Sequence, residues 1–228
     1  MTPRDREIVR WIGRLRMATA VQVAERFGLG RAVSYARLNG IVRLGLLDHA
    51  RIFHASPGVY LTTRAGLACV DLELPPSRVD LRTYDHDLEL STLVGELERE
   101  FGAGWISTER EMRAADTPGG SAPAERPRFA VPLAGGRGQL QLTPVGHPRL
   151  HFPDCAVRLG DDRARSQVVA VELERTAKGR ARLRRILSGY IASLHVGAVR
   201  YYVTSGRVRD LVATEVELLR AVDFIEIR

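Results

Sequence analysis

The stretch that most constrains the fold lies at residues 167–174, where Val168-Val169-Ala170-Val171 leads into Glu172-Leu173-Glu174. A run of apolar, largely β-branched residues favours a strand. Residues two apart lie on the same face of a strand, so Glu172 and Glu174 share one face. An earlier predicted strand carries Pro153-Asp154, and Lys178 follows closely after Glu174. The sequence therefore predicts three carboxylates and one lysine at neighbouring strands.

These residue types outline a Mg²⁺-dependent nuclease site. Mg²⁺ prefers carboxylate oxygens, and Asp154 and Glu172 could bind it from adjacent strands. The bound ion would acidify a water for attack on a phosphodiester. Such a site has a lysine two residues after the second acid, but Glu174 holds that position. Lys178, the only lysine in the chain, would have to reach back, because arginine stays protonated and cannot act as a base.

The order of predicted elements supports this interpretation. A long amphipathic helix at 84–101 is followed by strands at 105–108, 151–159 and 167–174, a helix at 178–194, a strand at 200–204, a helix at 210–221 and a strand at 224–227. Residues 82–228 thus have the order of a PD-(D/E)xK restriction-endonuclease-like mixed-sheet domain. Residues 114–150 read as an insertion, with a mobile loop at 114–128 and a β-hairpin at 129–150. A purely structural pairing of Asp154 and Glu172 with basic residues is equally open.

Residues 1–74 predict a different module. Thr2 and Pro3 can begin a first helix, and Thr19 can cap a second helix over 20–27. Gly28-Leu29-Gly30 is a turn, and a third helix at 31–44 ends at Gly45. Strands at 47–53 and 58–62 form a hairpin, and a short helix follows. This order is that of a winged helix-turn-helix, so the chain is an α/β (α+β) protein of two domains, and Pro75-Pro76 marks their boundary.

The charge distribution points to nucleic acid. Residues 1–70 hold eleven arginines and four acids, so this segment carries the whole formal net charge of +7. A basic segment on a helix-turn-helix fold indicates contact with double-stranded DNA, although the same fold also serves dimerisation. The expected DNA-binding residues lie on the third helix and the hairpin: Arg31, Tyr35, Arg37, Arg43, Arg51 and His54.

Other features exclude some classes of protein. No apolar run is long enough for a membrane span, and the N-terminus lacks the apolar segment of a signal peptide. Cys69 and Cys155 lie far apart in apolar surroundings, which is typical of reduced thiols, so we expect a cytoplasmic protein.

The chain resembles the replication-relaxation family of bacterial plasmid and mobile-element proteins. The resemblance spans nearly the whole chain outside residues 114–150. It rests on Arg4-Asp5-Arg6-Glu7-Ile8, Tyr60-Leu61-Thr62-Thr63-Arg64-Ala65-Gly66, His86-Asp87-Leu88, Glu109-Arg110-Glu111, Pro153-Asp154, Val171-Glu172-Leu173-Glu174, Lys178 and Tyr190. The basic residue that usually precedes Pro-Asp is replaced by Phe152, with His151 ahead of it. The resemblance implies DNA binding in replication, relaxation or mobilisation, with a nuclease-like second domain.

The leading hypothesis is therefore a DNA-binding accessory or regulatory factor of a plasmid or mobile element. It would act as a homodimer on a repeated site, alongside a relaxase or replication protein. The first alternative is a Mg²⁺-dependent DNA endonuclease using Asp154, Glu172 and Lys178, with Glu174 beside them. The second is a transcriptional repressor whose second domain only dimerises.

Overall fold

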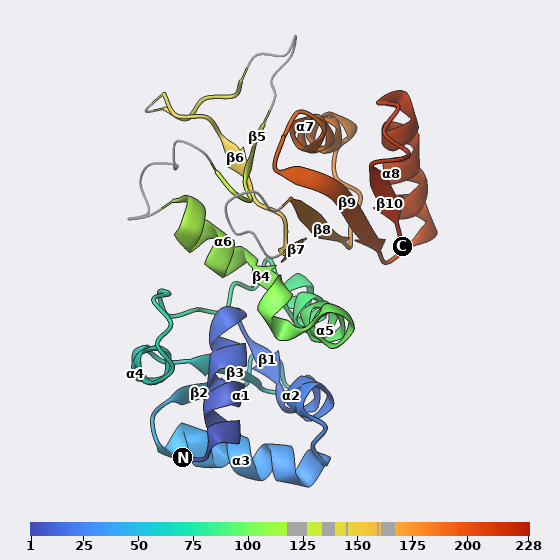
Figure 1. Cartoon of the computed structure of the whole chain (residues 1–228). Coiled ribbons are helices and arrows are strands. Elements are labelled where there is room, and N and C mark those ends of the chain that lie inside the picture. Colours follow the sequence, from blue (N-terminus) through green and yellow to red (C-terminus); the bar gives the residue numbers. More distant parts are fainter. Residues whose placement is uncertain (118–126, 134–139, 145, 159, 161–166) are drawn as a thin grey trace. The chain divides into compact units, whose positions relative to one another are not determined.

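The computed structural model describes residues 1–117, 127–133, 140–144, 146–158, 160 and 167–228 (Figure 1). The chain is a mixed α/β protein with two compact units, Met1–Glu100 and Phe101–Arg228. The division falls after residue 100, whereas the sequence placed it between residues 74 and 82. The long helix at 84–101 was assigned to the second domain, but almost all of it belongs to the first unit.

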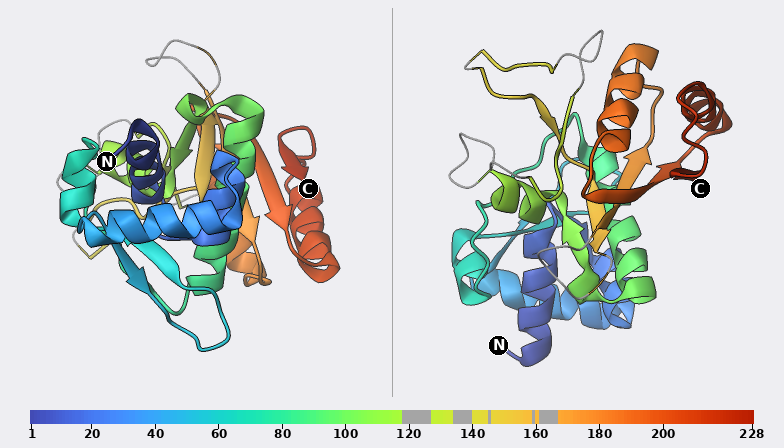
Figure 2. Two further views of the ribbon diagram at one scale, coloured as in Figure 1. Left: turned by 90° about the horizontal axis from the view of Figure 1, so that it is seen from below. Right: turned by 45° about the horizontal axis from the view of Figure 1, so that its top comes forward.

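The first unit begins with helices and a small sheet. Its elements are α1 (Pro3–Arg14), β1 (Ala18–Thr19), α2 (Ala20–Phe27), α3 (Arg31–Arg43), β2 (Leu47–Ala50), β3 (Val59–Thr62), α4 (Arg64–Cys69) and α5 (Tyr84–Phe101). The strands form an antiparallel sheet in the order β1-β3-β2. In the left view of Figure 2 the loop between β2 and β3 extends away from the helices. Strand β1 was not predicted, because two residues are too few to show an alternating pattern.

The sequence signals around α2 and α3 are confirmed in detail. Thr19 accepts the backbone N–H of Gln22, whose side chain bonds back to Thr19, so a capping box begins α2. Gly28 ends α2 with φ +62°, a conformation that favours glycine. Ser34 is fully buried, and its Oγ donates to the carbonyl oxygen of Ala20 at 2.8 Å. The small serine thus lets α3 pack closely against α2.

Helix α5 is held in the first unit by polar contacts. Ser91 Oγ donates to the carbonyl oxygen of Met17 at 2.7 Å, and Gln22 Nε2 donates to the carbonyl oxygen of Leu88 at 2.6 Å. Leu93, Val94 and Leu97 are buried on the same helix. These contacts explain why the unit ends after α5 rather than at Pro75-Pro76.

The second unit is built on a five-stranded sheet. Its elements are a 3₁₀ turn (Ala103–Trp105), β4 (Ile106–Thr108), α6 (Glu109–Asp116), β5 (Val131–Pro132), β6 (Leu150–His151), β7 (Cys155–Arg158), β8 (Val168–Glu174), α7 (Arg180–Ile191), β9 (Val196–Val203), α8 (Gly206–Leu218) and β10 (Ile225–Ile227). The order is β10-β9-β8-β7-β4. Strands β4, β7 and β8 pair antiparallel, while β8, β9 and β10 run parallel.

All seven residues of β8 are buried, as the apolar run at 168–171 indicated. The parallel strands are connected by α7 and α8, which pack on the sheet and share one apolar core. Their buried side chains are Leu183, Ile186, Leu187 and Tyr190 from α7, with Val208, Val212 and Val216 from α8. The site residues therefore start from a strand at the centre of the unit.

Two expectations for residues 114–159 are wrong in part. The strand expected at 151–159 is interrupted: β6 ends at His151, β7 begins at Cys155, and Asp154 lies in the break. Pro153 has no backbone N–H for a sheet ladder, which accounts for the break, and Leu159 lies outside the described residues. The first residues of the expected loop form the end of α6, through Asp116.

The remainder of the insertion is described only in part. Residues 118–126 of the expected loop and 134–139 and 145 of the expected hairpin lie outside the described residues. At the base of the hairpin β5 pairs antiparallel with β6. Buried Asp116 accepts backbone N–H groups of Arg128, Phe129 and Ala130, each at 2.8 Å, and so fixes the segment that leads into β5.

Among the residues described, no helix combines the length and the apolar character that a membrane crossing requires.

Candidate functional site

The carboxyl end of β8 places Glu172 and Glu174 in buried positions. Glu172 lies opposite Tyr201 of the parallel neighbour β9. Its Oε1 is 2.7 Å from His151 Nε2 and also accepts the hydroxyl of Tyr190 from α7. A carboxylate with an imidazole and a phenol on one oxygen is held in a single orientation.

Lys178 reaches back to this strand. Its Nζ lies 2.6 Å from Glu174 Oε2 and 3.8 Å from Glu172 Oε2. The five residues between Glu174 and α7 form the short connection that returns Lys178 to the end of β8. The contact expected from sequence is thus present, and the ammonium neutralises part of the negative charge of the pair.

Asp154 approaches the same strand from the break between β6 and β7. Its Oδ2 accepts the backbone N–H of Leu173 at 2.7 Å, between the two glutamates in sequence. The structure therefore brings together all four residues that the sequence predicted for this site. We call the group of His151, Asp154, Glu172, Glu174, Lys178 and Tyr190 the acidic cluster.

The electrostatics of the two glutamates differ. Burial acts to raise the pKa of Glu172, but the charge and hydrogen bond of His151, helped by Lys178 and Tyr190, outweigh it and hold the pKa at about 2. For Glu174 burial prevails over the attraction of Lys178, and the pKa is raised. Burial acts to lower the pKa of Lys178, but the two glutamates raise it, so the lysine stays charged.

The chemistry of this arrangement is that of a charge network. A magnesium ion needs several oxygen ligands that converge on one point. Asp154 Oδ2 and Glu172 Oε1, which were expected to bind the metal, face protein hydrogen-bond donors, and a lysine ammonium already lies against both glutamates. Within the described ranges no three His, Cys, Asp or Glu side chains are arranged to hold a metal ion. In this arrangement protein groups contact the oxygens that were expected to bind Mg²⁺.

Sequence reasoning did not assign roles to His151, Tyr190 or Tyr201. Tyr190 has the spacing of the buried face of α7, so its hydroxyl was the only signal of a polar role. Tyr201 is fully buried on β9, and its hydroxyl has no hydrogen-bond partner among the residues that the structure describes. Burial and the nearby carboxylates raise the pKa of both tyrosines well above 10, so both keep their protons.

The second candidate site is the exposed side of α3 in the first unit. Ser34, Leu38 and Ile41 are its buried residues, as predicted. Arg31 stacks on Tyr35 with its guanidinium carbon 5.9 Å from the ring centre. The remaining expected DNA-binding residues of the helix end and the β2–β3 loop are exposed: Arg43, Arg51 and His54. Asn39, which the sequence analysis did not single out, is exposed on the same helix.

Arg37 differs from the other arginines of this group. Its Nη1 lies 2.8 Å from Asp5 Oδ1 and 3.3 Å from Thr2 Oγ1, and its side chain is 33% exposed. Burial acts to raise the pKa of Asp5, but the hydrogen bonds from Thr2, helped by Arg37, outweigh it and lower this pKa. Arg37 therefore ties α3 to the start of α1, which gives it a structural role that the sequence did not indicate.

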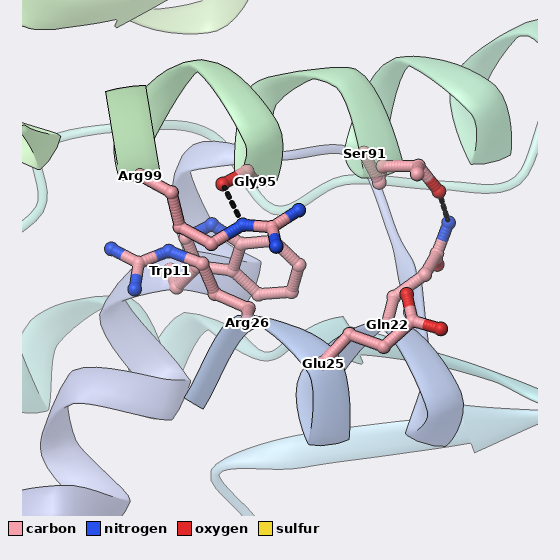
Figure 3. Close-up of a pocket in the computed structure, with 8 residues that line it drawn as sticks. Trp11, Gln22, Glu25, Arg26, Ser91, Gly95 and Arg99 are labelled. Carbon is pink, nitrogen blue, oxygen red and sulfur yellow. Dashed lines mark hydrogen bonds between the residues drawn. The ribbon is translucent and has the colours of Figure 1, made fainter. Parts of the chain in front are cut away.

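A small recess in the first unit lies between α2 and α5 (Figure 3). Trp11, Arg26 and Arg99 line it, and Arg99 Nε donates to the carbonyl oxygen of Gly95. The indole nitrogen of Trp11 is buried without a hydrogen-bond partner in the described residues. The free space is about 10 Å³, close to the least that one water molecule needs. The recess is too small for a substrate.

No family model, curated protein or solved structure matches this chain.

Proposed function

We propose that the first unit is a winged helix-turn-helix that binds double-stranded DNA through α3 and the β2–β3 loop. In this arrangement the third helix enters the major groove, and the hairpin contacts the backbone. Arg31, Arg43 and Arg51 are the contacts to phosphates or guanine edges. Tyr35 supports Arg31, and His54 lies at the tip of the hairpin.

The observation that carries this proposal is the separation of paired and unpaired arginines. Counted over the compact unit, residues 1–100 hold fourteen basic and thirteen acidic residues, so the positive excess of the N-terminal segment is nearly cancelled. The acids of α5 neutralise α1, α2 and the turn after α1: Glu98 pairs with Arg14 and Arg26, and Asp87 lies near Arg16. The arginines of the proposed DNA surface have no acidic partner among the described residues.

The resemblance to the replication-relaxation family is the basis for the proposed biological role. We propose an accessory or regulatory factor in replication, relaxation or mobilisation of a plasmid or mobile element. It acts as a homodimer on a repeated site, with a relaxase or replication protein as partner. A transcriptional repressor would use the same DNA surface, and a reporter driven by the chain's own binding site separates the two roles.

The test of DNA binding is the salt dependence of duplex affinity. Each phosphate contact contributes about 0.9 to the slope of log K against log salt concentration. The double variant Arg43→Gln/Arg51→Gln should lower the slope by about 2 and weaken binding at low salt. The matched control is Arg10→Gln/Arg64→Gln, which removes two exposed arginines of α1 and α4. Equal slopes for the two double variants would refute the assignment of the DNA surface.

The endonuclease alternative is favoured by one observation, the meeting of Asp154, Glu172, Glu174 and Lys178 at the end of β8. The order of β4, β7, β8, α7 and β9 also agrees with a PD-(D/E)xK-like core. The pairing of these acids with protein donors argues against a cutting site. We therefore expect no nicking of supercoiled DNA with Mg²⁺ or Mn²⁺. Nicking by the wild type that is lost in Asp154→Ala would establish the nuclease instead.

A further inference from the structure

The second unit carries most of the net positive charge of the protein. Residues 101–228 hold twenty basic and fourteen acidic residues, an excess of six. Between residues 175 and 209 the chain has nine basic residues and no acid. Residues 71–228 taken together are neutral, because the nine acids and three arginines of residues 71–100 offset this excess.

The fold gathers these basic residues at one edge of the sheet. Strands β8 and β9 are parallel, and α7 and α8 each begin just after one of them, so both helix amino ends lie at the carboxyl edge of the strands. Arg184 of α7 and Glu215 of α8 are joined at 2.8 Å, which links the two helices. We define the arginine edge as the basic residues of these two amino ends for which the described part of the chain offers no acidic partner: Arg180, Arg182, Arg185, Arg207 and Arg209.

Among the residues that the structure describes, the arginine edge has no acidic partner. Other basic residues of the same segment are paired: Lys178 with Glu174, Arg184 with Glu215 and Arg200 with Glu226. Arg180, Arg182 and Arg207 are exposed and have no hydrogen bond or ion pair of their side chains within the part of the chain that the structure describes. Arg185 donates to the carbonyl oxygen of Ala181 and Arg209 to that of Ile227, and neither has an acidic partner among the residues described.

This placement works against helix stability. The amino end of a helix carries partial positive charge, so arginines in the first turn cost a few tenths of a kcal/mol each, whereas acids there would stabilise. Neither α7 nor α8 has an acid in its first turn, and Gly179 gives α7 no side-chain cap. A bound anion would reverse this unfavourable electrostatics, since it meets both the helix amino end and the guanidinium groups.

The surroundings indicate which kind of anion fits. Protein interfaces depend on buried aromatic and apolar anchors. The exposed apolar residues of these helices, Ile191 and Leu218, lie at their carboxyl ends, away from the arginine edge. A surface of arginines without apolar anchors matches a row of phosphates better than an acidic peptide.

We propose that the arginine edge is a second DNA-contacting surface, which binds the phosphate backbone of duplex DNA independently of base sequence. The proposal rests on the proposed function, because the partner is the same duplex that the first unit binds. It gives the second unit a role in affinity and in positioning the chain on DNA, rather than in reading the sequence.

The experiment uses the full chain and measures duplex affinity over a range of salt concentrations. The double variant Arg180→Gln/Arg207→Gln removes one arginine from each helix and should lower the salt slope by about 2. The control double variant Arg149→Gln/Arg220→Gln removes two other exposed arginines of the same unit, and Arg220 follows the opposite end of α8. The control should leave the slope unchanged, and circular dichroism should show all variants folded.

The outcomes distinguish this proposal from the proposed function. If the wild type binds duplex DNA and both double variants keep its slope, the arginine edge is not a DNA surface, while the first unit's role stands. A wild type that does not bind duplex DNA refutes both. If the arginine-edge variant loses affinity for poly-glutamate but keeps its affinity for duplex DNA, the partner is an acidic protein and the proposal fails. Phosphate contacts do not depend on base sequence. Arg180→Gln/Arg207→Gln should therefore weaken the binding of a duplex of scrambled sequence as much as that of any other duplex of the same length.

Discussion

The two units neutralise their buried glutamates in different ways. In the first unit Glu98 accepts from two arginines, Arg14 and Arg26, so two guanidinium groups share one carboxylate. In the second unit Glu172 shares one lysine with Glu174 and also contacts His151 and Tyr190. Both carboxylates are almost fully buried.

The difference shows what each glutamate does. Glu98 joins α5 to α1 and α2 through its ion pairs with Arg14 and Arg26. The acidic cluster holds more carboxylate than cationic charge, an imbalance that costs free energy unless protons or external cations compensate it. The first arrangement is a structural connection, and the second has the imbalance that is common at functional sites.

The largest loss of stability is expected from Glu98→Gln. Glu98→Gln removes the buried carboxylate charge that Arg14 and Arg26 share, so the free energy of unfolding should fall by about 3 kcal/mol. Urea unfolding followed by circular dichroism measures it. Glu96→Gln on the exposed side of α5 is the control and should change stability by less than about 0.5 kcal/mol. Equal losses in both variants would contradict a structural role for Glu98.

A smaller loss is expected from Lys178→Met, which keeps the length of the side chain but removes its charge. Glu172 and Glu174 would then repel each other, and the free energy of unfolding at pH 7 should fall by about 2 kcal/mol. Because burial raises the pKa of Glu174, this side chain takes up a proton first as the pH falls below 7, and the loss should shrink. A loss that is independent of pH would show that the packing of Lys178, rather than its charge, is what matters.

Glu172 should make the stability of the protein depend on pH in the acidic range. The pKa of Glu172 is about 2 in the folded protein and lies below its ordinary value of 4.5, so the unfolded chain takes up the proton first. Its contribution to stability is present above pH 4.5 and is lost as the pH falls toward 2. Glu174, with a raised pKa, acts in the opposite direction. Glu172→Gln should therefore flatten the decline of stability over this range, whereas exposed Glu217→Gln should leave it unchanged.

The smallest effect is expected from Arg37→Gln, which tests whether an arginine of the first unit is structural or binds DNA. Its ion pair with Asp5 is partly exposed, so its loss should cost about 0.5 kcal/mol of stability. The salt slope of DNA binding should be unchanged. A slope lower by about 1 would place Arg37 at the phosphates.

Local signals predicted much of this fold. Thr19, Gly28 and Ser34 marked the start, the end and the close packing of α2, since capping, positive φ and small size depend on neighbouring residues only. The run at 168–171 identified the central strand for a similar reason. The two-residue strand β1 was missed because it is too short to show an alternating pattern. Helix α6 was missed because the capping box of Thr108 and Glu111 that begins it was not recognised.

Part of the acidic cluster was predicted from the sequence. Asp154, Glu172, Glu174 and Lys178 were found from residue type and spacing along neighbouring strands. His151 and Tyr190 were not assigned to it, because their contacts with Glu172 join the end of β6, the end of β8 and the last turn of α7. Contacts between elements far apart in the sequence leave no periodic pattern.

The sequence by itself determined the order of helices and strands, the two acidic positions of β8 and the basic character of the N-terminal segment. Only the tertiary structure decided which charges meet. It assigned α5 to the first unit, where the acids of α5 neutralise the arginines of α1 and α2, and it left the second unit with the larger positive excess. The physical reason is that charge compensation depends on distances of a few ångströms between side chains, and these distances are set by packing.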